Sequence, residues 1–203
     1  MDIILFTTLP QRYGHIKGTR KFEKLRKLTI NRYYTPEHDN RFYKQVICFL
    51  FFFTKSLFFS LKYARSCDVV FATSSRLGTG FLGYLISKLF NKKFALDVRD
   101  VFSDSLQSIS IFNNFLGSMI INCVKYIEKL IIINADWVNF VSPGFFDYPH
   151  INPKGKDIRL FTNGIDRIFI KNRKIMKSKK QNVVNSDVLN ITYAGNIGYG
   201  QGL

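Results

Sequence analysis

One strand–helix–strand pattern, at residues 68–105, constrains the fold of this chain more than any other feature. Residues 69–72 form a short apolar run of β-forming residues, which stops at the small hydroxyl residues 73–75, suited to a loop that caps a helix. Apolar residues then recur at helical spacing over 81–90, and a second apolar strand spans 94–98. Parallel strands joined by a crossover helix belong to an open α/β sheet.

Polar residues follow each of these two strands directly. Ligands of an open α/β sheet bind outside the carboxyl ends of its strands, so these polar residues are the first candidates for a functional site. The candidates are Ser74, Ser75, Arg76, Arg99, Asp100 and Asp104. Because the strands are parallel, we expect the two groups of side chains to converge on one rim of the sheet.

The rest of the chain repeats the alternation of strands and helices. Apolar runs predict further strands, and helical spacing predicts an amphipathic helix over 112–131. The predicted strands span 3–7, 137–141, 158–162 and 188–194. Residues 11–41 are expected to form a surface loop with one or two short strands, and Ser142 is expected to cap a short helix with proline at its first position. The predicted class is α/β, a Rossmann-like open, mostly parallel sheet with helices on both faces.

Composition changes near the C-terminal end. Residues 171–182 hold six Lys or Arg, which is typical of an exposed linker. We therefore expect one domain over 1–170, a basic linker over 171–187, and the first strand and glycine-rich loop of another domain over 188–203. A strand that runs into a glycine-rich loop is an arrangement that binds phosphates through backbone amides, although glycines at a chain end are also common in floppy termini.

The charge of the chain is strongly positive. The 203 residues include 30 Lys and Arg against 14 Asp and Glu, a formal net charge of +16. Such a surface favours polyanions, anionic lipid headgroups or phosphate-bearing substrates, but a biased base composition would explain the abundance of lysine equally well. The three cysteines have no paired spacing, which indicates a reducing compartment without disulfides or a zinc site.

The segment 45–63 is apolar almost all the way round a predicted helix and is rich in phenylalanine. Its length is borderline for a membrane span, and Lys55 interrupts it. Three interpretations stay open: a spanning helix, a buried helix against the sheet, and a helix that lies partly in a membrane interface. Basic residues on both flanks favour the interfacial alternative over the spanning one.

Five short segments in order resemble the bacterial family-4 glycosyltransferases, including the group that adds sugars to lipid-linked precursors of surface polysaccharides. Each segment is a weak motif alone, and their order over about 130 residues makes the resemblance specific. The segments are DVVFATSSRL at 68–77, LDVRDVFSDS at 96–105, ADWVNFVSPGF at 135–145, FTNGID at 161–166 and YAGNIG at 193–198.

The resemblance implies a GT-B fold, in which two Rossmann-like domains face each other and sugar transfer occurs between them without a metal or a cofactor. It places Asp100 and Arg99 nearest the reacting acceptor hydroxyl, with Asp100 as the candidate base. The acceptor-side residues that it implies are Ser74, Ser75, Arg76 and Asp104. The donor-side residues that it implies are Asn163, Gly164, Asp166, Gly195, Asn196 and Gly198.

The resemblance also implies the partners and the place of action. The donor is a nucleotide sugar, the acceptor is a glycan linked to polyprenyl diphosphate, and the transferase is retaining. The expected location is cytoplasmic, peripheral on the inner face of the plasma membrane, with an anionic membrane surface as a partner. Family members have a further strand before the position of Met1 and more than a hundred residues after the Gly195 loop, so we expect a fragment with little activity by itself.

Simpler structural roles compete with these assignments. Asp100 and Asp104 would also suit ordinary helix capping, Asp97 a hydrogen-bonded position in the sheet, and Arg99 a surface ion pair with Asp104. The histidines, His150 among them, have no ligand spacing and are expected in loops or at the surface.

The alternative function is a non-catalytic basic α/β module that binds anionic membrane or nucleic acid through charge. No helix interleaves basic and aromatic residues as nucleic-acid motifs do, so nucleic acid is not an expected partner of the transferase.

Overall fold

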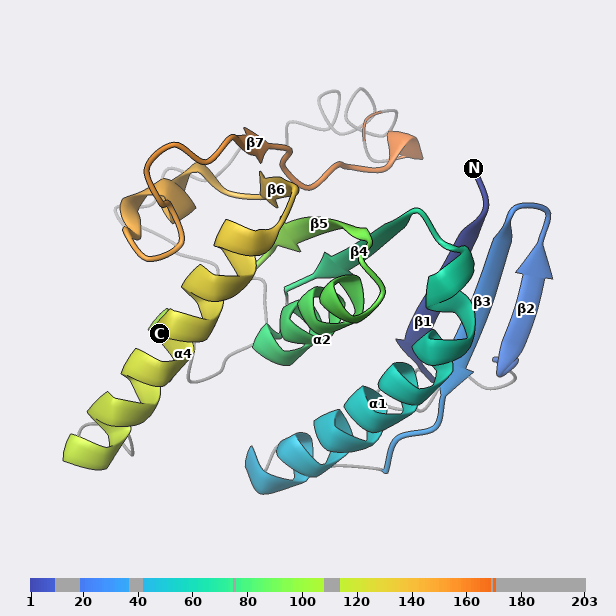
Figure 1. The fold of residues 1–203 in the computed structure, drawn as a ribbon, viewed down its shortest axis with the longest axis horizontal. Coiled ribbons are helices and arrows are strands. Elements are labelled where there is room, and N and C mark those ends of the chain that lie inside the picture. The colour runs from blue at the N-terminus through green and yellow to red at the C-terminus, as the bar shows by residue number, and fades with distance from the viewer. Residues whose placement is uncertain (10–18, 37–41, 75, 108–113, 169, 171–203) are drawn as a thin grey trace, which may run out of the picture.

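The computed structural model describes residues 1–9, 19–36, 42–74, 76–107, 114–168 and 170. A sheet of four parallel strands has the order β4 (Val69–Thr73), β5 (Lys93–Val98), β6 (Trp137–Phe140) and β7 (Ile158–Leu160) (Figure 1). The predicted strand–helix–strand unit is confirmed, because α2 (Leu77–Leu89) joins β4 to β5.

Glycines allow α2 to lie close to the parallel sheet. A Cβ atom on Gly83 would lie 2.6 Å from the Cβ of Ala72 in β4 and 2.9 Å from the ring of Phe94 in β5. Any larger residue at position 83 would therefore push the helix away from the two strands. Phe94 is almost fully buried beneath this contact, so the close approach of α2 excludes solvent from the core.

The connection from β5 to β6 contains two helices. The short α3 (Phe102–Gln107) follows β5, and α4 (Phe115–Asn134) leads to β6. The Asn114 side chain caps α4 by accepting a hydrogen bond from the Gly117 amide at 2.7 Å. Ile131 and Ile132 of α4 join the main core on the face of the sheet that α2 also covers. The helix predicted from the apolar repeat over 112–131 is confirmed over Phe115–Asn134, and residues 112 and 113 lie outside the described residues.

The short strands expected within 11–41 are present as two strands, but the second contributes to the core and does not lie only on the surface. β3 (Leu28–Tyr33) pairs in parallel with β1 (Ile3–Thr8) and antiparallel with β2 (Phe22–Leu25). Ile30 and Tyr33 are each 8% exposed. Pairing with β1 places Tyr33 beneath the aromatic side chains of the following helix. The sequence of β3 lacks a regular alternation of apolar and polar residues, so its burial could not be predicted from the pattern.

The helix α1 (Phe42–Tyr63) packs on this three-stranded sheet and on α2. Tyr33 stacks with Phe59, their ring centroids 5.3 Å apart, and Phe53 and Leu57 contact the cluster formed by Ala64, Leu82 and Ile86. Val46–Ser66 is the one helical stretch among the described residues that is long and apolar enough, by length and composition, to cross a membrane. Its packed face joins it to the rest of the domain.

No backbone ladder among the described residues joins β1 to β4, so the strands form two sheets. A cavity of about 230 Å³, lined by residues of both strands and of α1, lies between them. The predicted fold class is confirmed in its essentials, because a parallel four-stranded sheet flanked by helices matches a Rossmann-like half of a GT-B fold. The linker and second-domain predictions fall on residues 171–203, outside the described residues.

The N-cap residues of two helices make no side-chain cap hydrogen bond, and Ser75, one of the hydroxyl residues expected to cap α2, lies outside the described residues. Arg76 is the N-cap residue of α2 and Ser142 that of the short 3-10 helix Pro143–Asp147, and neither side chain makes a cap hydrogen bond. Proline does occupy the first turn of the second helix, as predicted. A backbone conformation suited to capping is therefore present at both sites without the side-chain contact.

Candidate functional site

The ends of β4 and β5 bring the two groups of predicted site residues to one rim of the parallel sheet. The amide of Ser74 donates a hydrogen bond to the carbonyl oxygen of Asp97 at 2.8 Å, which continues the pairing of Thr73 with Asp97. Ser74 and Asp100 line the same small cavity, whose volume of about 20 Å³ is close to that of one water molecule. A sugar would therefore lie outside this cavity, over the rim.

A polar network extends along the rim from β5 to the loop after β7. Asn139 of β6 donates to Asp97 at 2.5 Å and accepts from the Phe161 amide at 2.7 Å. Arg99 lies 3.7 Å from the carboxylate of Asp97 and donates a hydrogen bond to the side chain of Asn163. The expected ion pair between Arg99 and Asp104 is thus wrong, because Arg99 contacts Asp97 and Asn163 instead. The expectation that Asp97 is hydrogen-bonded within the sheet is confirmed.

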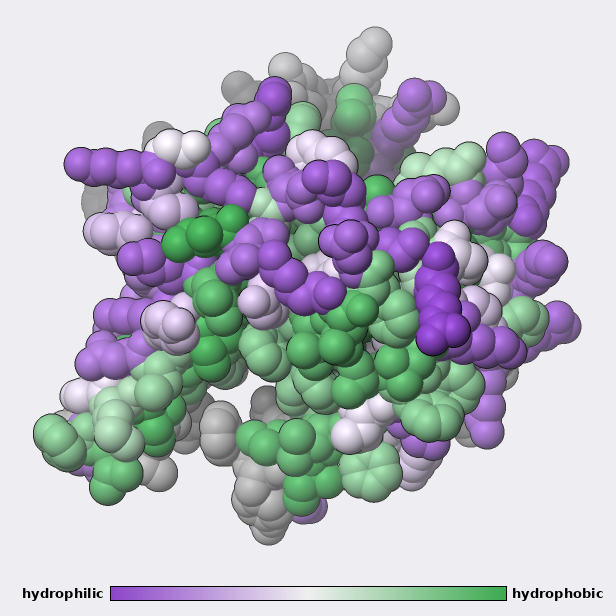
Figure 2. All heavy atoms as spheres, in the orientation of Figure 1, coloured by the Kyte–Doolittle hydropathy of each residue, from purple (hydrophilic) through white to green (hydrophobic). Residues whose placement is uncertain are grey.

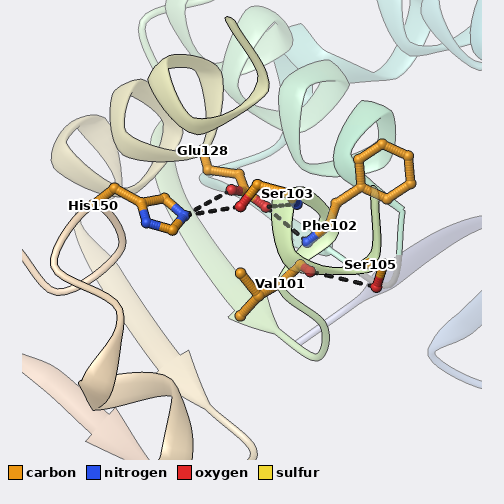
Figure 3. Close-up of polar contacts among 6 residues, drawn as sticks. All are labelled: Val101, Phe102, Ser103, Ser105, Glu128 and His150. Atoms are coloured by element: carbon orange, nitrogen blue, oxygen red, sulfur yellow. Dashed lines mark hydrogen bonds and ion pairs between the residues drawn. The ribbon is translucent and has the colours of Figure 1, made fainter. Parts of the chain in front are cut away.

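Glu128 of α4 supports the loop that carries Asp100 (Figure 3). Its side chain is 7% exposed and accepts hydrogen bonds from the amides of Phe102 at 2.8 Å and Ser103 at 3.2 Å. These amides belong to the first turn of α3, whose N–H groups have no partner inside the helix. The expectation that Asp100 or Asp104 caps this helix is therefore wrong for these two amides, because they donate to the Glu128 carboxylate of α4 instead.

His150 completes the cluster around Glu128. Its Nε2 atom lies 2.9 Å from Oε2 of Glu128 and 3.1 Å from the hydroxyl of Ser103. His150 lies in a turn, which agrees with the expected loop position, but its side chain is largely buried, at 17% exposed. A hydrolytic triad needs the acid on one ring nitrogen and the nucleophile on the other. Here both partners meet Nε2, and Ser103 is fully buried, so the cluster is a support rather than a nucleophile.

The surroundings of Asp100 favour its protonated form. Partial burial raises the pKa of Asp100 above its ordinary value, a backbone hydrogen bond with Val101 opposes this, and the negative charges of Glu128 and Asp104 raise it further. Hydrogen bonding to Asp104 in turn raises the pKa of the Tyr148 hydroxyl. A carboxyl group whose pKa is raised suits proton transfer.

The remaining predicted residues are more scattered. Arg76 and Asp104 are exposed beside the rim, and Asn163, Gly164 and Asp166 are exposed in the segment after β7. Through Asn163, the structure brings one predicted donor-side residue into contact with a predicted catalytic one. The other predicted residues, Ser75, Gly195, Asn196 and Gly198, lie outside the described residues. The roles of all these residues stay predictions.

Glu128 and His150 were missed by reasoning from the sequence, although one of them leaves a signal. Glu128 is the acidic residue that falls within the buried apolar stripe of α4, between Val124 and Ile131. A lone carboxylate in such a stripe requires buried partners, because an unpaired buried charge is costly. His150 lies in a turn with no periodic pattern around it and leaves no comparable signal.

The fold is that of a Rossmann-like half of a GT-B fold. The structure of a sucrose-phosphate synthase from Thermosynechococcus elongatus is similar, with a TM-score of 0.51 over 87% of this chain and 84% of that chain. The two sequences are 16% identical, so the likeness concerns the fold. No protein-family model and no curated protein sequence matches the chain.

Proposed function

We propose that this chain is the acceptor-side domain of a retaining glycosyltransferase, which moves a sugar from a nucleotide-sugar donor to a lipid-linked glycan in surface polysaccharide synthesis. The observation that carries the proposal is the convergence of Ser74, Arg99 and Asp100 on the carboxyl edge of the parallel sheet. The glycosyltransferase-like fold supports the reaction class. The lipid-linked acceptor rests on the sequence resemblance.

Asp100 accepts the proton of the acceptor hydroxyl as the acceptor oxygen bonds to the anomeric carbon, while the bond from that carbon to the diphosphate oxygen breaks and the nucleoside diphosphate leaves. Its raised pKa supports this role, because a base is most effective when its pKa lies near the working pH. Glu128 and His150 act through the backbone of α3, and they hold the segment that follows Asp100 in place. They are positioning residues in this proposal.

Arg99 links the acceptor rim to the donor side. Its guanidinium contacts both Asp97 and Asn163, and it carries a fixed positive charge at the position that the resemblance assigns to the reacting groups. A guanidinium is suited to the diphosphate of a polyprenyl-linked acceptor or of a nucleotide sugar. Contact with Asn163 would hold this charge at the boundary between the two substrates.

The test measures transfer of labelled sugar from nucleotide sugars to a polyprenyl-diphosphate-linked glycan in detergent micelles. It uses the chain together with any domain encoded in frame beyond Leu203. Transfer that Asp100→Asn abolishes, while Asp157→Asn at an exposed position has no effect, is the expected result. Unchanged turnover in Asp100→Asn would exclude Asp100 as the base.

The alternative, a non-catalytic basic module, makes a different prediction for the same preparations. It predicts no transfer at all, together with binding to polyanions that weakens steeply with salt and does not depend on the Asp100 side chain. Binding of a polyprenyl-diphosphate glycan that does depend on Asp100 and Arg99 would count against it.

A further inference from the structure

The cavity of about 230 Å³ between the two sheets follows the edges of two strands. All residues of β4, Val69–Thr73, line it, and so do Ile4, Leu5 and Phe6 of β1. Side chains of a strand alternate between its two faces, so consecutive residues line one cavity only where it runs along the strand edge. Among the described strands β1 pairs only with β3 and β4 only with β5, so the backbone groups on these two facing edges have no ladder partner there.

One face of α1 and one face of α2 close the cavity. α1 contacts both β1 and α2, and α2 contacts β4, so the four elements that bound the cavity hold one another in place. The lining residues on each helix recur at spacings of three and four, which puts them on one side of that helix. They are Phe52, Ser56, Ser60 and Tyr63 on α1, and Thr79, Leu82, Gly83 and Ile86 on α2.

The cavity carries no charge among the described residues that line it. The chain as a whole has 30 Lys and Arg and 14 Asp and Glu, so this lining differs from the rest of the molecule. Figure 2 shows apolar residues gathered over α1 and α2, and hydrophilic residues over the opposite end of the same view. An ion in the cavity would lose its hydration without gaining a partner of opposite charge, which is costly. The cavity therefore selects neutral molecules.

Ser56 places a hydrogen-bonding group without a partner in the wall of the cavity. The residue is 2% exposed, and its hydroxyl has no hydrogen-bond partner among the described residues. Ser60, one turn further along α1, lines the same cavity but donates its hydroxyl to the Leu57 carbonyl oxygen at 2.7 Å. A buried hydroxyl without a partner is unfavourable, so a ligand that exchanges a hydrogen bond with Ser56 removes this cost.

We propose that the cavity binds a neutral, mostly apolar small molecule of about two fused rings, whose hydroxyl or carbonyl group exchanges a hydrogen bond with the Ser56 hydroxyl. An apolar cavity of roughly 150 Å³ holds one benzene ring. The volume of about 230 Å³ therefore accommodates a larger ring system. This inference goes beyond the proposed function, because the cavity shares no lining residue with the small cavity at Ser74 and Asp100.

The experiment compares three probes with the same rings, namely 2-naphthol, naphthalene and 2-naphthoate, in thermal unfolding of the full chain at pH 7. The dependence of the melting temperature on probe concentration gives each dissociation constant. 2-Naphthol is expected to bind most tightly, and naphthalene about two- to tenfold more weakly, because it cannot bond to Ser56. 2-Naphthoate is expected to cause no shift, despite the net charge of +16, because its carboxylate would be buried without a partner.

Ser56→Ala and Ser60→Ala are a matched pair of variants. In Ser56→Ala, 2-naphthol is expected to bind no more tightly than naphthalene, because the hydrogen bond is lost. In Ser60→Ala the difference between the two probes is expected to persist, because the Ser60 hydroxyl already has the Leu57 carbonyl as its partner. Ser56→Ala removes a hydroxyl that has no partner in the described part of the chain, so this variant is expected to fold.

Alkylation of cysteines by iodoacetamide provides a second measurement, which needs no variant. Cys67 is partly exposed and lines the cavity, whereas Cys123 is exposed on α4. 2-Naphthol is expected to slow the alkylation of Cys67 and to leave that of Cys123 unchanged. Mass spectrometry of the digested chain measures the rate at each cysteine.

Four outcomes would overturn the proposal. They are the absence of any shift with 2-naphthol, binding of 2-naphthoate as tight as that of 2-naphthol, the same behaviour in Ser56→Ala and Ser60→Ala, and a Cys67 that does not react even without a probe. The last would mean that another segment of polypeptide fills the cavity. None of these measurements involves a nucleotide sugar or sugar transfer, so their failure is distinguishable from failure of the proposed function.

Discussion

At the scale of single residues, Asp100 combines a functional position with a cost to stability. The pKa of Asp100 is raised, so its charged form is less favourable in the folded chain than in the unfolded chain. The stabilising contribution of its protonated form is present below the ordinary pKa and is lost as the pH rises through the raised pKa. A raised pKa that lowers the stability of the folded chain at neutral pH is typical of carboxylates at functional sites.

Asp100→Asn is therefore expected to stabilise the chain at neutral pH while abolishing transfer. The amide keeps the shape of the side chain and removes the partly buried charge that Glu128 and Asp104 repel. Thermal unfolding followed by circular dichroism at pH 7 and near pH 4 measures the difference. The gain is expected to shrink at the lower pH, where a larger fraction of Asp100 is protonated. A melting temperature that falls at pH 7 would contradict this account.

His150→Ala is expected to destabilise the chain by about 1–3 kcal/mol, because it leaves the buried carboxylate of Glu128 without its side-chain partner. Urea unfolding monitored by circular dichroism measures this free energy. Lys154→Ala, at an exposed position in the same loop, is the matched control and is expected to change little. Equal effects of the two substitutions would show that the Glu128–His150 contact does not stabilise the fold.

At the scale of elements, the distance between α2 and the sheet determines the geometry of the rim. α2 begins directly after the Ser74 loop, so any outward shift of the helix would move that loop relative to Asp100. Two glycines of α2 face the sheet, and they differ in the space around them. Gly83 meets Ala72 and Phe94 at under 3.0 Å, whereas the nearest atoms to a Cβ on Gly80 lie at 3.4 Å or more.

These two glycines make a matched pair for substitution by alanine. Alanine in a helix is favoured over glycine by about 1 kcal/mol, so Gly80→Ala is expected to raise the free energy of unfolding. Gly83→Ala is expected to lower it despite the same gain, because overpacking against the rigid Cβ of Ala72 costs about 1–3 kcal/mol. Urea unfolding of both variants measures these free energies. Equal changes of the same sign in the two variants would mean that α2 can shift on the sheet without cost.

At the scale of the whole molecule, the chain is an asymmetric, positively charged body. α2 and α4 cover one face of the parallel sheet, while Phe71 and Trp137 on the other face remain exposed. The chain carries a formal net charge of +16. The long-range field of such a charge attracts anions of every kind, so specificity depends on the side chains of the rim.

The single tryptophan offers a test at this scale. Trp137 is 54% exposed on the uncovered face of the sheet, so its fluorescence is expected to be quenched readily by small ions. Iodide is expected to quench more strongly than caesium, because the positive field concentrates anions, and high salt is expected to reduce the difference. Emission that resists both quenchers would mean that this face is covered in solution.

Much of the fold could be predicted because its signals are local. The apolar runs at β4, β5, β6 and β7 and the helical spacing of α4 predicted these elements to within a few residues. The rim could be predicted too, since parallel strands must end at one edge. The three strands of the smaller sheet were expected, but the burial of β3 was missed, because β3 lacks a regular alternation and its burial comes from β1 and α1.

The sequence by itself determined the parallel sheet, the candidate residues at its carboxyl edge and the apolar character of α1, because periodicity and turn residues act over a few neighbouring positions. Only the tertiary structure decided that Glu128 rather than Asp100 holds the first turn of α3, and that Arg99 meets Asn163. These partners lie 25 or more residues apart in the chain. Their pairing depends on how helices and strands pack, and no local pattern records it.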